Sequence, residues 1–356
     1  MNFARARRSS WGRIFARWGG LALLAVAIAM LAPYLGSGTE LVRLRNALSL
    51  GADLETLPAW QGADAPADYQ QEQVPPDRYF VDIARRIGAT AEPDAWKRAL
   101  LIARHLLGRA PHLLGNPVQK GLRDTYLQII DSGRGYCGDF VRVFIAIADA
   151  AQLRVRPWAF SLDGFGGRGH VWVEVWLPEH QRWQLLDVFS NYYYVAEREG
   201  PPLSAGELYR DLRERQVRLE LRAIDPDVRP GWVIEAKAWD YLRSGLDGWY
   251  LPWGNDVFTV AAALPVRVVR DTNPVLRGVA AWLAGVQPQV RLLATPDNAP
   301  QRAAMHRLHF RVLAAGAAAA VALVWLVVGG GSSLLRRLRP HRASAADALG
   351  ARACRS

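Results

Sequence analysis

The sequence predicts an α+β fold outside the membrane, flanked by two membrane-spanning helices. Residues 137–150 carry apolar side chains on most sides of a helix, which is typical of a buried central helix. Extended segments follow, and His170–Trp176 alternates with the period of a β-strand. Near each end of the chain lies an uncharged apolar run that is long enough to cross a bilayer.

The net charge of the 356 residues is +11, and it is concentrated at the two ends. Residues 1–18 contribute +5 and residues 332–356 contribute another +5, so the part between them is nearly neutral. A nucleic-acid-binding domain needs its basic patch on the folded part, so this class of function is disfavoured. The two cysteines, Cys137 and Cys354, exclude a disulfide framework and a four-cysteine zinc site.

The two apolar runs predict transmembrane helices over residues 19–35 and 312–331. The first run is also compatible with a signal peptide cleaved near Ala27–Ala29, but its long basic start favours an uncleaved anchor. Arginines flanking the runs favour cytoplasmic tails, 1–18 and 332–356, around an outer part. The excess of Arg over Lys and the abundant Ala indicate a bacterium with a GC-rich genome. We therefore expect the bilayer to be a bacterial inner membrane and the outer part to be periplasmic.

Within the outer part, the composition of residues 51–77 predicts a linker or a loosely packed arm, within a linker and arm region 36–94. A catalytic core is expected over 95–195, with helices from Trp96 and from Tyr126 preceding the central helix. Residues 196–311 are expected to form an extension of unknown role. Its tryptophans favour core packing or membrane contact over a groove that stacks sugars or peptides. No metal site or cofactor is predicted.

Three residues carry the predicted chemistry, and the first is Cys137 at the start of the central helix. The helix start favours a thiolate, and a backbone N–H there can stabilise an oxyanion. His170 opens the alternating strand, and Asp187 lies toward the end of the next one, Trp183–Phe189. If the hairpin pairs Trp176 with Trp183, paired residue numbers add up to 359, and His170 and Asp187 become diagonal neighbours on one face.

The valine face of the strand is expected to meet other core elements, while the His170 face meets the cysteine helix. His170 would take the thiol proton, and Asp187 would orient the imidazole ring. Cys137 would attack an amide or ester carbonyl, form a thioester and pass the acyl group to water or an amine. The glycine-rich segment 164–169 is expected to be a mobile lip. Substrate contacts are expected at Tyr136, Gly169 and Trp172.

Three motifs resemble those of the transglutaminase-like superfamily. They are Gly-Arg-Gly-Tyr-Cys-Gly-Asp-Phe at 133–140, Gly-His-Val-Trp-Val-Glu-Val at 169–175 and Trp-Gln-Leu-Leu-Asp at 183–187. The resemblance covers about residues 95–195 and implies a papain-like core with a Cys-His-Asp triad, here Cys137, His170 and Asp187. Proteins of this superfamily include crosslinkers, peptidases and deglycosylating amidases. The chain has Val188 after the aspartate, where the family often has proline. The segments before residue 95 and after residue 195 resemble no known family, so the resemblance does not imply a particular substrate.

The sequence therefore predicts a membrane-anchored cysteine enzyme that acts on amide bonds of a cell-envelope or exported substrate. The substrate would be a peptide or protein, including glycan-linked ones, and hydrolysis is favoured over transamidation. The alternative is a catalytically inactive scaffold or binding protein of an envelope or exopolysaccharide assembly. No nucleic-acid partner is expected.

Overall fold

The computed structural model describes residues 2–62, 64–108, 115, 118, 120–196, 200–214, 218–228, 231–269, 272 and 274–337. The chain forms two compact units. One consists of Met1–Pro33 with Phe310–Ser356, and the other is Tyr34–His309. Cys354 and the rest of the predicted C-terminal tail after residue 337 lie outside the described residues.

The first unit contains the long helix α1 (Asn2–Leu31) and the part of the long helix α12 (Ala299–Arg337) that begins at Phe310. The 3-10 turn η1 (Ala32–Tyr34) follows α1. Each helix includes a stretch that is long and apolar enough to cross a membrane. These are Arg17–Tyr34, with a mean hydropathy of 1.4, and Ala299–Val327, with 2.1. The helices meet at Gly19 and Gly20, where an added Cβ would lie 3.0 Å from the Trp325 ring and 3.1 Å from Leu326. Small residues thus allow close packing, as between membrane helices.

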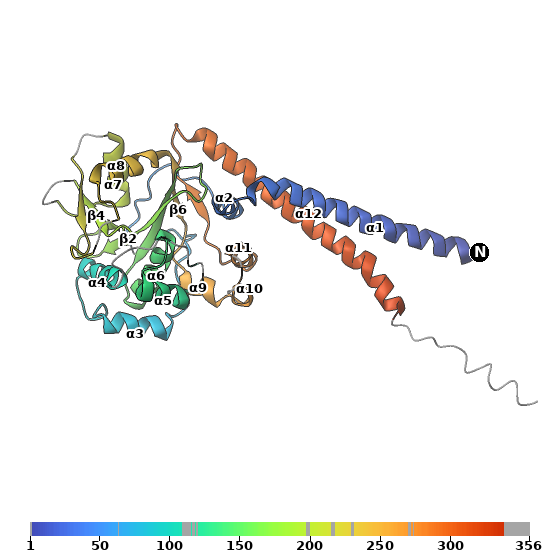
Figure 1. Cartoon of the computed structure of the whole chain (residues 1–356), viewed down its shortest axis with the longest axis horizontal. Coiled ribbons are helices and arrows are strands. Elements are labelled where there is room, and N and C mark those ends of the chain that lie inside the picture. Colours follow the sequence, from blue (N-terminus) through green and yellow to red (C-terminus); the bar gives the residue numbers. More distant parts are fainter. Residues whose placement is uncertain are drawn as a thin grey trace, which may run out of the picture. The chain divides into compact units, whose positions relative to one another are not determined.

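The second unit contains a five-stranded antiparallel sheet with the strand order β3-β2-β1-β6-β7. Its strands β2 and β6 are labelled in Figure 1. A separate pair, β4 and β5, is also antiparallel. The predicted α+β class is therefore confirmed. The strands are β1 (Val155–Ser161), β2 (Gly169–Leu177), β3 (Arg182–Leu186), β4 (Tyr192–Val195), β5 (Glu220–Ala223), β6 (Trp249–Pro252) and β7 (Val290–Leu292).

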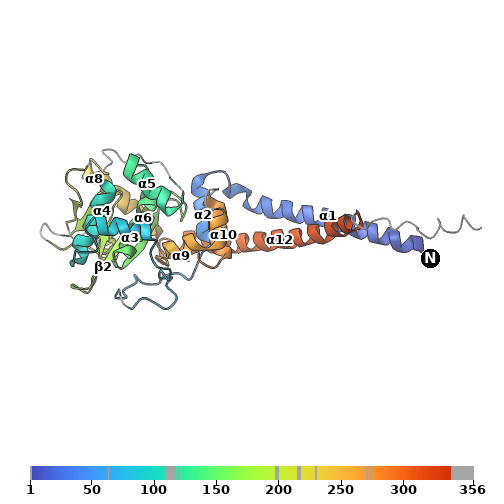
Figure 2. The ribbon, with the colours of Figure 1, turned by 90° about the horizontal axis from the view of Figure 1, so that it is seen from below.

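The helices of the second unit surround this sheet (Figures 1 and 2). The central helix has the predicted bounds, and the two helices predicted before it are present as α4 and α5. The helices are α2 (Gly38–Leu48), α3 (Arg78–Arg86), α4 (Ala95–Leu107), α5 (Leu122–Ser132), α6 (Cys137–Ala150), α7 (Ala205–Glu214), α8 (Glu235–Ser244), the 3-10 turn η2 (Leu246–Gly248), α9 (Val257–Ala262), α10 (Leu264–Val268) and α11 (Pro274–Leu283).

The central helix α6 packs against the valine face of β2, in a core shared with α3, α4 and α5. Val173 and Val175 are fully buried in this core. The expectation that the His170 face meets the cysteine helix is therefore wrong. The physical reason is Glu174, which lies on the same face as His170 and needs hydrogen-bond donors that the apolar sides of α6 do not offer.

The opposite face of the sheet is covered by a second core rich in aromatic rings. Trp172, Trp249 and Trp253 are buried there, together with side chains of α7 and α8. The predicted extension 196–311 therefore supplies two strands of the main sheet, β6 and β7, and part of its core. The burial of Trp239, Trp249 and Trp253 agrees with core packing as their role, whereas Trp232 and Trp282 lie outside this core. The folded core thus extends well beyond residue 195.

Within the second unit, the described residues of 51–77 pack against the second core and α9, so the prediction of a loose arm is wrong. Trp60 and Tyr69 pack their rings against Trp253, with centroids 5.2 and 5.7 Å away. The Glu72 carboxylate accepts hydrogen bonds from the backbone N–H groups of Phe258 and Thr259 at the start of α9. The proline- and glutamine-rich composition indicates irregular backbone here, and the buried Tyr69 and the partly buried Trp60 hold that backbone in place.

A buried ion pair links β1, β2 and α7 beneath this segment. Glu174 is fully buried, and Arg156 is 3% exposed. Glu174 Oε2 accepts hydrogen bonds from Arg156 Nε at 2.5 Å and Trp158 Nε1 at 2.6 Å, and Oε1 accepts one from the Ala205 N–H at 2.6 Å. The guanidinium of Arg156 lies over the Trp183 ring, 4.2 Å from its centroid. Both charges are therefore paired inside the second core.

Candidate active site

Cys137 is placed by a sharp junction between α5 and α6. Gly133 ends α5 in the left-handed conformation, with φ +64°, which allows the chain to turn into α6 within four residues. Asp139 in the first turn of α6 fixes the helix start, because its carboxylate accepts hydrogen bonds from the N–H groups of Tyr136 and Val118 at 3.1 and 3.0 Å. Cys137 is the first residue of α6, and its half-buried thiol is not part of a disulfide. Its N–H therefore belongs to the electropositive end of the helix.

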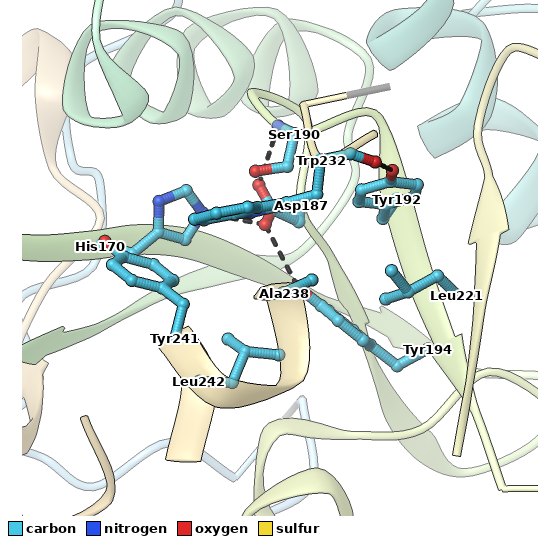
Figure 3. Close-up of a pocket in the computed structure, with 10 residues that line it drawn as sticks. All are labelled: His170, Asp187, Ser190, Tyr192, Tyr194, Leu221, Trp232, Ala238, Tyr241 and Leu242. Atoms are coloured by element: carbon cyan, nitrogen blue, oxygen red, sulfur yellow. Dashed lines mark hydrogen bonds and ion pairs between the residues drawn. The ribbon is translucent and has the colours of Figure 1, made fainter. Parts of the chain in front are cut away.

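His170 and Asp187 meet as the hairpin register predicts. Val173 pairs with Leu186 and Trp176 with Trp183, so paired residue numbers add up to 359, as predicted. His170 Nε2 lies 2.8 Å from Asp187 Oδ2 (Figure 3). This is the approach of an ion pair, although its angle departs from that of a straight hydrogen bond.

Asp187 is held from several directions immediately after β3. Its Oδ1 accepts a hydrogen bond from the Ser190 N–H at 3.1 Å, and its Oδ2 accepts one from the Tyr194 hydroxyl at 3.1 Å (Figure 3). Its backbone exchanges two hydrogen bonds with Tyr192, of 2.8 and 3.0 Å. The carboxylate is therefore both buried and oriented, with Oδ2 shared between Tyr194 and His170.

The imidazole of His170 interacts with both Asp187 and Cys137. Burial lowers the pKa of His170, but the negative charge of Asp187 and the side chain of Cys137 together outweigh that effect and raise the pKa to about 10. Because Nε2 faces Asp187, Nδ1 is the ring nitrogen left for Cys137. Because the pKa of His170 is higher in the folded than in the unfolded chain, its protonation stabilises the fold. This stabilisation is complete below pH ~6.5, the unfolded pKa, and is lost as the pH rises through the pKa of the folded protein.

Aromatic side chains frame the His170 ring. Trp172 packs edge-on against it with centroids 5.3 Å apart, and Phe160, Phe189 and Tyr241 lie 6.2 to 6.4 Å away. Trp172 is fully buried, so it has no surface for the substrate contact expected of it. We therefore reassign it as a residue that positions His170.

The other two expected substrate contacts differ in their surroundings. Tyr136 is 46% exposed next to Cys137, so its side chain is open to a ligand. Gly169 lies against β1, where an added Cβ would be 1.9 Å from the carbonyl oxygen of Phe160. Its own carbonyl accepts a hydrogen bond from the Tyr241 hydroxyl at 2.9 Å. Glycine is thus required at 169 by strand packing.

The segment 164–169 is fastened to α2, in contrast to the mobile lip expected from its glycines. Phe165 is fully buried, and its carbonyl accepts a hydrogen bond from Asn46 Nδ2 at 2.9 Å. The Gly167 N–H donates to the carbonyl of Thr39 at 3.0 Å. Its glycines serve tight turns and close contacts with α2.

A small pocket beside His170 and Asp187 is lined largely by residues after 187 that the sequence analysis did not identify (Figure 3). Tyr194 comes from β4, Tyr241 from α8, and Trp232 from the segment before α8. The run Tyr192–Tyr194, five residues after Asp187, was a signal that could have pointed to Tyr194. Among the described residues there is no group of three or more His, Cys, Asp or Glu side chains able to hold a metal ion.

The comparisons with known proteins agree with the motif analysis. Residues 81–188 match the family model of the transglutaminase-like superfamily, and this range includes Cys137, His170 and Asp187. A search of solved structures finds a candidate cysteine protease from Cytophaga hutchinsonii, with 17% identity over 51% of this chain and 64% of that chain. Its TM-score of 0.26 is too low to support any conclusion on fold or chemistry. No curated protein matches the chain.

The pKa of His170 is expected to fall by more than about one unit in Asp187→Asn, because the negative charge that raises it is removed. The pKa is measured by NMR titration of the protein labelled in its histidine rings, with the His170 signal assigned by its absence in His170→Ala. Tyr194→Phe is the matched control, since it removes a hydrogen bond from the same carboxylate but keeps the charge. An unchanged pKa in Asp187→Asn would contradict the ion pair.

Proposed function

We propose that this chain, whose residues 81–188 belong to the transglutaminase-like superfamily, is a cysteine enzyme that transfers acyl groups through a thioester. Cys137 is the nucleophile, His170 the general acid and base, and Asp187 the group that orients the imidazole. One observation carries the proposal. The Nε2 atom of His170 lies 2.8 Å from a buried carboxylate, and the same imidazole interacts with Cys137 at the start of α6.

The reaction begins with transfer of the thiol proton from Cys137 Sγ to His170 Nδ1. The thiolate attacks the substrate carbonyl carbon, and a backbone N–H at the start of α6 stabilises the resulting oxyanion. When the tetrahedral intermediate collapses, the C–N or C–O bond breaks and His170 gives its proton to the leaving group. Water or an amine then attacks the thioester while His170 takes a proton from it, and the thiol is restored at the end.

The proposed substrate is an amide bond in a peptide or protein of the cell envelope, or in an exported one. The helices α1 and α12 anchor the enzyme in a bacterial inner membrane, with both tails in the cytoplasm and Tyr34–His309 in the periplasm. Support comes from the apolar stretches in both helices and from the arginines at both ends of the sequence. Hydrolysis is favoured over transamidation, because water is abundant there.

Acyl transfer is tested with the full chain in detergent micelles and p-nitrophenyl acetate as a general acyl donor. The reaction is quenched with acid, and the intact mass is measured. We expect one acetyl group on the wild-type chain, none on Cys137→Ala and one on Cys354→Ala, which is the matched control. Faster release of this group when a primary amine is added indicates a transamidase, and an unchanged rate indicates a hydrolase. If Cys137 stays unmodified while free cysteine is acetylated, the inactive-scaffold alternative replaces this proposal.

A further inference from the structure

The helices α10 and α11 expose a large apolar surface. They pack on each other through Val266, Ala280 and Ala281, which are buried between them. Their outer side is apolar as well, and Leu264, Val268 and Leu283 are 70, 76 and 71% exposed. We call this outer side the α10–α11 face; it consists of Leu264, Val268, Leu276, Val279, Trp282 and Leu283. A contiguous apolar surface of this kind marks a site of interaction with a membrane or another protein.

The spacing on α11 shows that the exposed residues belong to one side of the helix. Leu276, Val279 and Leu283 follow each other at i, i+3 and i+7, whereas Ala280 and Ala281 point inward. A surface helix of a globular protein carries polar residues on its outer side, so α11 has the pattern of a helix with apolar surroundings on both sides. Exposure of the α10–α11 face to water is unfavourable, so we expect an apolar partner to cover it.

Charge favours a lipid surface as this partner. The stretch 257–286 contains three arginines and one acidic residue. Arg267 is exposed beside Val268 on α10, and the exposed Arg45 of α2 lies against α11, its side chain 3.6 Å from the Cβ position of Gly278. Apolar side chains bordered by arginine are typical of segments in the interface of an anionic bilayer. Symmetric pairing of two copies through this face would instead bring like charges together.

A short connection in the sequence links the first apolar stretch to α2, the helix on which α11 packs. The apolar stretch Arg17–Tyr34 ends three residues before α2 begins at Gly38. Three residues reach at most about 14 Å between flanking Cα atoms. Within the second unit, α11 packs directly on α2. In both views α2 and α10 lie on the same side of the second unit (Figures 1 and 2).

We propose that the α10–α11 face inserts into the interfacial region of the bilayer, with Arg45 and Arg267 at its border contacting anionic headgroups. This contact is additional to the two spans and rests on the membrane anchoring proposed above. It determines which side of the Tyr34–His309 unit faces the lipid. Substrates therefore meet the catalytic residues in an orientation set by the membrane surface.

The inference is tested with nitroxide labels on the full chain in vesicles of phosphatidylcholine and phosphatidylglycerol at 3:1. Single cysteines are introduced as Val268→Cys or Leu283→Cys in a Cys137→Ser/Cys354→Ser background. The matched control is Leu127→Cys on α5, an exposed leucine outside the face, and Val324→Cys on α12 reports the span itself. Paramagnetic resonance measures collisions with oxygen, which is enriched in lipid, and with a nickel chelate, which stays in water.

The oxygen-to-nickel collision ratio at 268 and 283 is expected to exceed that at 127 by at least about threefold. A ratio equal to that at 127, with a lipid-like ratio at 324, overturns this inference and leaves the anchoring intact. A water-like ratio at 324 overturns both. Protection from both reagents, with spin–spin broadening that disappears on dilution with unlabelled chain, identifies a second copy as the partner and also overturns the inference.

Discussion

Replacing His170 with alanine is expected to slow the alkylation of Cys137 by iodoacetamide at pH 6 by between about 10-fold and about 100-fold. In the wild type, the imidazole beside Cys137 can accept the thiol proton and leave a thiolate. The variant lacks this acceptor, and free cysteine at pH 6 is thiolate only to the order of 0.3%. A thiolate whose thiol has a lowered pKa is a weaker nucleophile, so the two alkylation rates differ by less than the two thiolate fractions do. The rate is measured by the intact mass of quenched samples.

His180→Ala is the matched control, because His180 is exposed on the turn between β2 and β3. We expect it to react at the wild-type rate, and we expect a Cys354→Ala background to leave the result unchanged. If wild type and His170→Ala both react at the rate of free cysteine, the proposed nucleophile is not activated. That outcome would favour the inactive scaffold over the enzyme.

The substitution Glu174→Ala is expected to lower the free energy of unfolding by about 3–5 kcal/mol. The substitution leaves Arg156 as a buried charge without its carboxylate, and it removes the acceptor of Trp158 Nε1 and of the Ala205 N–H. A loss of this size is a large part of the 5–15 kcal/mol that is usual for a folded domain. Urea unfolding of the detergent-solubilised chain, followed by circular dichroism, measures the change.

Asp82→Ala is the control for an exposed pair, since Arg85 and Asp82 form an ion pair at 3.2 Å on the surface of α3. It should cost less than about 1 kcal/mol. The double variant Arg156→Met/Glu174→Leu should recover most of the stability lost in Glu174→Ala, because it removes both charges together. If the double variant is as unstable as the single one, shape rather than the unpaired charge explains the loss.

The sequence was informative where the structure depends on local periodicity. The bounds of α6 follow from its apolar pattern, and the meeting of His170 with Asp187 follows from a short hairpin whose turn sets the register. The positions of β6 and Tyr241 could not be predicted in this way. They reach the site through long-range packing, which leaves no regular spacing in the sequence. The cysteine helix was assigned to the wrong face of β2, because period 2 separates the two faces of a strand but does not tell which element covers each.

The strand order has a further consequence for how the chain folds and for how it can be shortened. The superfamily match ends at residue 188. The strand β1 pairs with β2 on one side and with β6 on the other, and β6 begins only at Trp249. A fragment ending near 195 would therefore leave the backbone N–H and C=O groups of β1 unpaired along one edge and available to pair with another chain. The same edge stays open during synthesis until some sixty further residues of the growing chain have been made. We thus expect short fragments around the triad to aggregate. A fragment in which β1 keeps both of its neighbours has to extend at least through β6, and β7 then pairs with the outer side of β6.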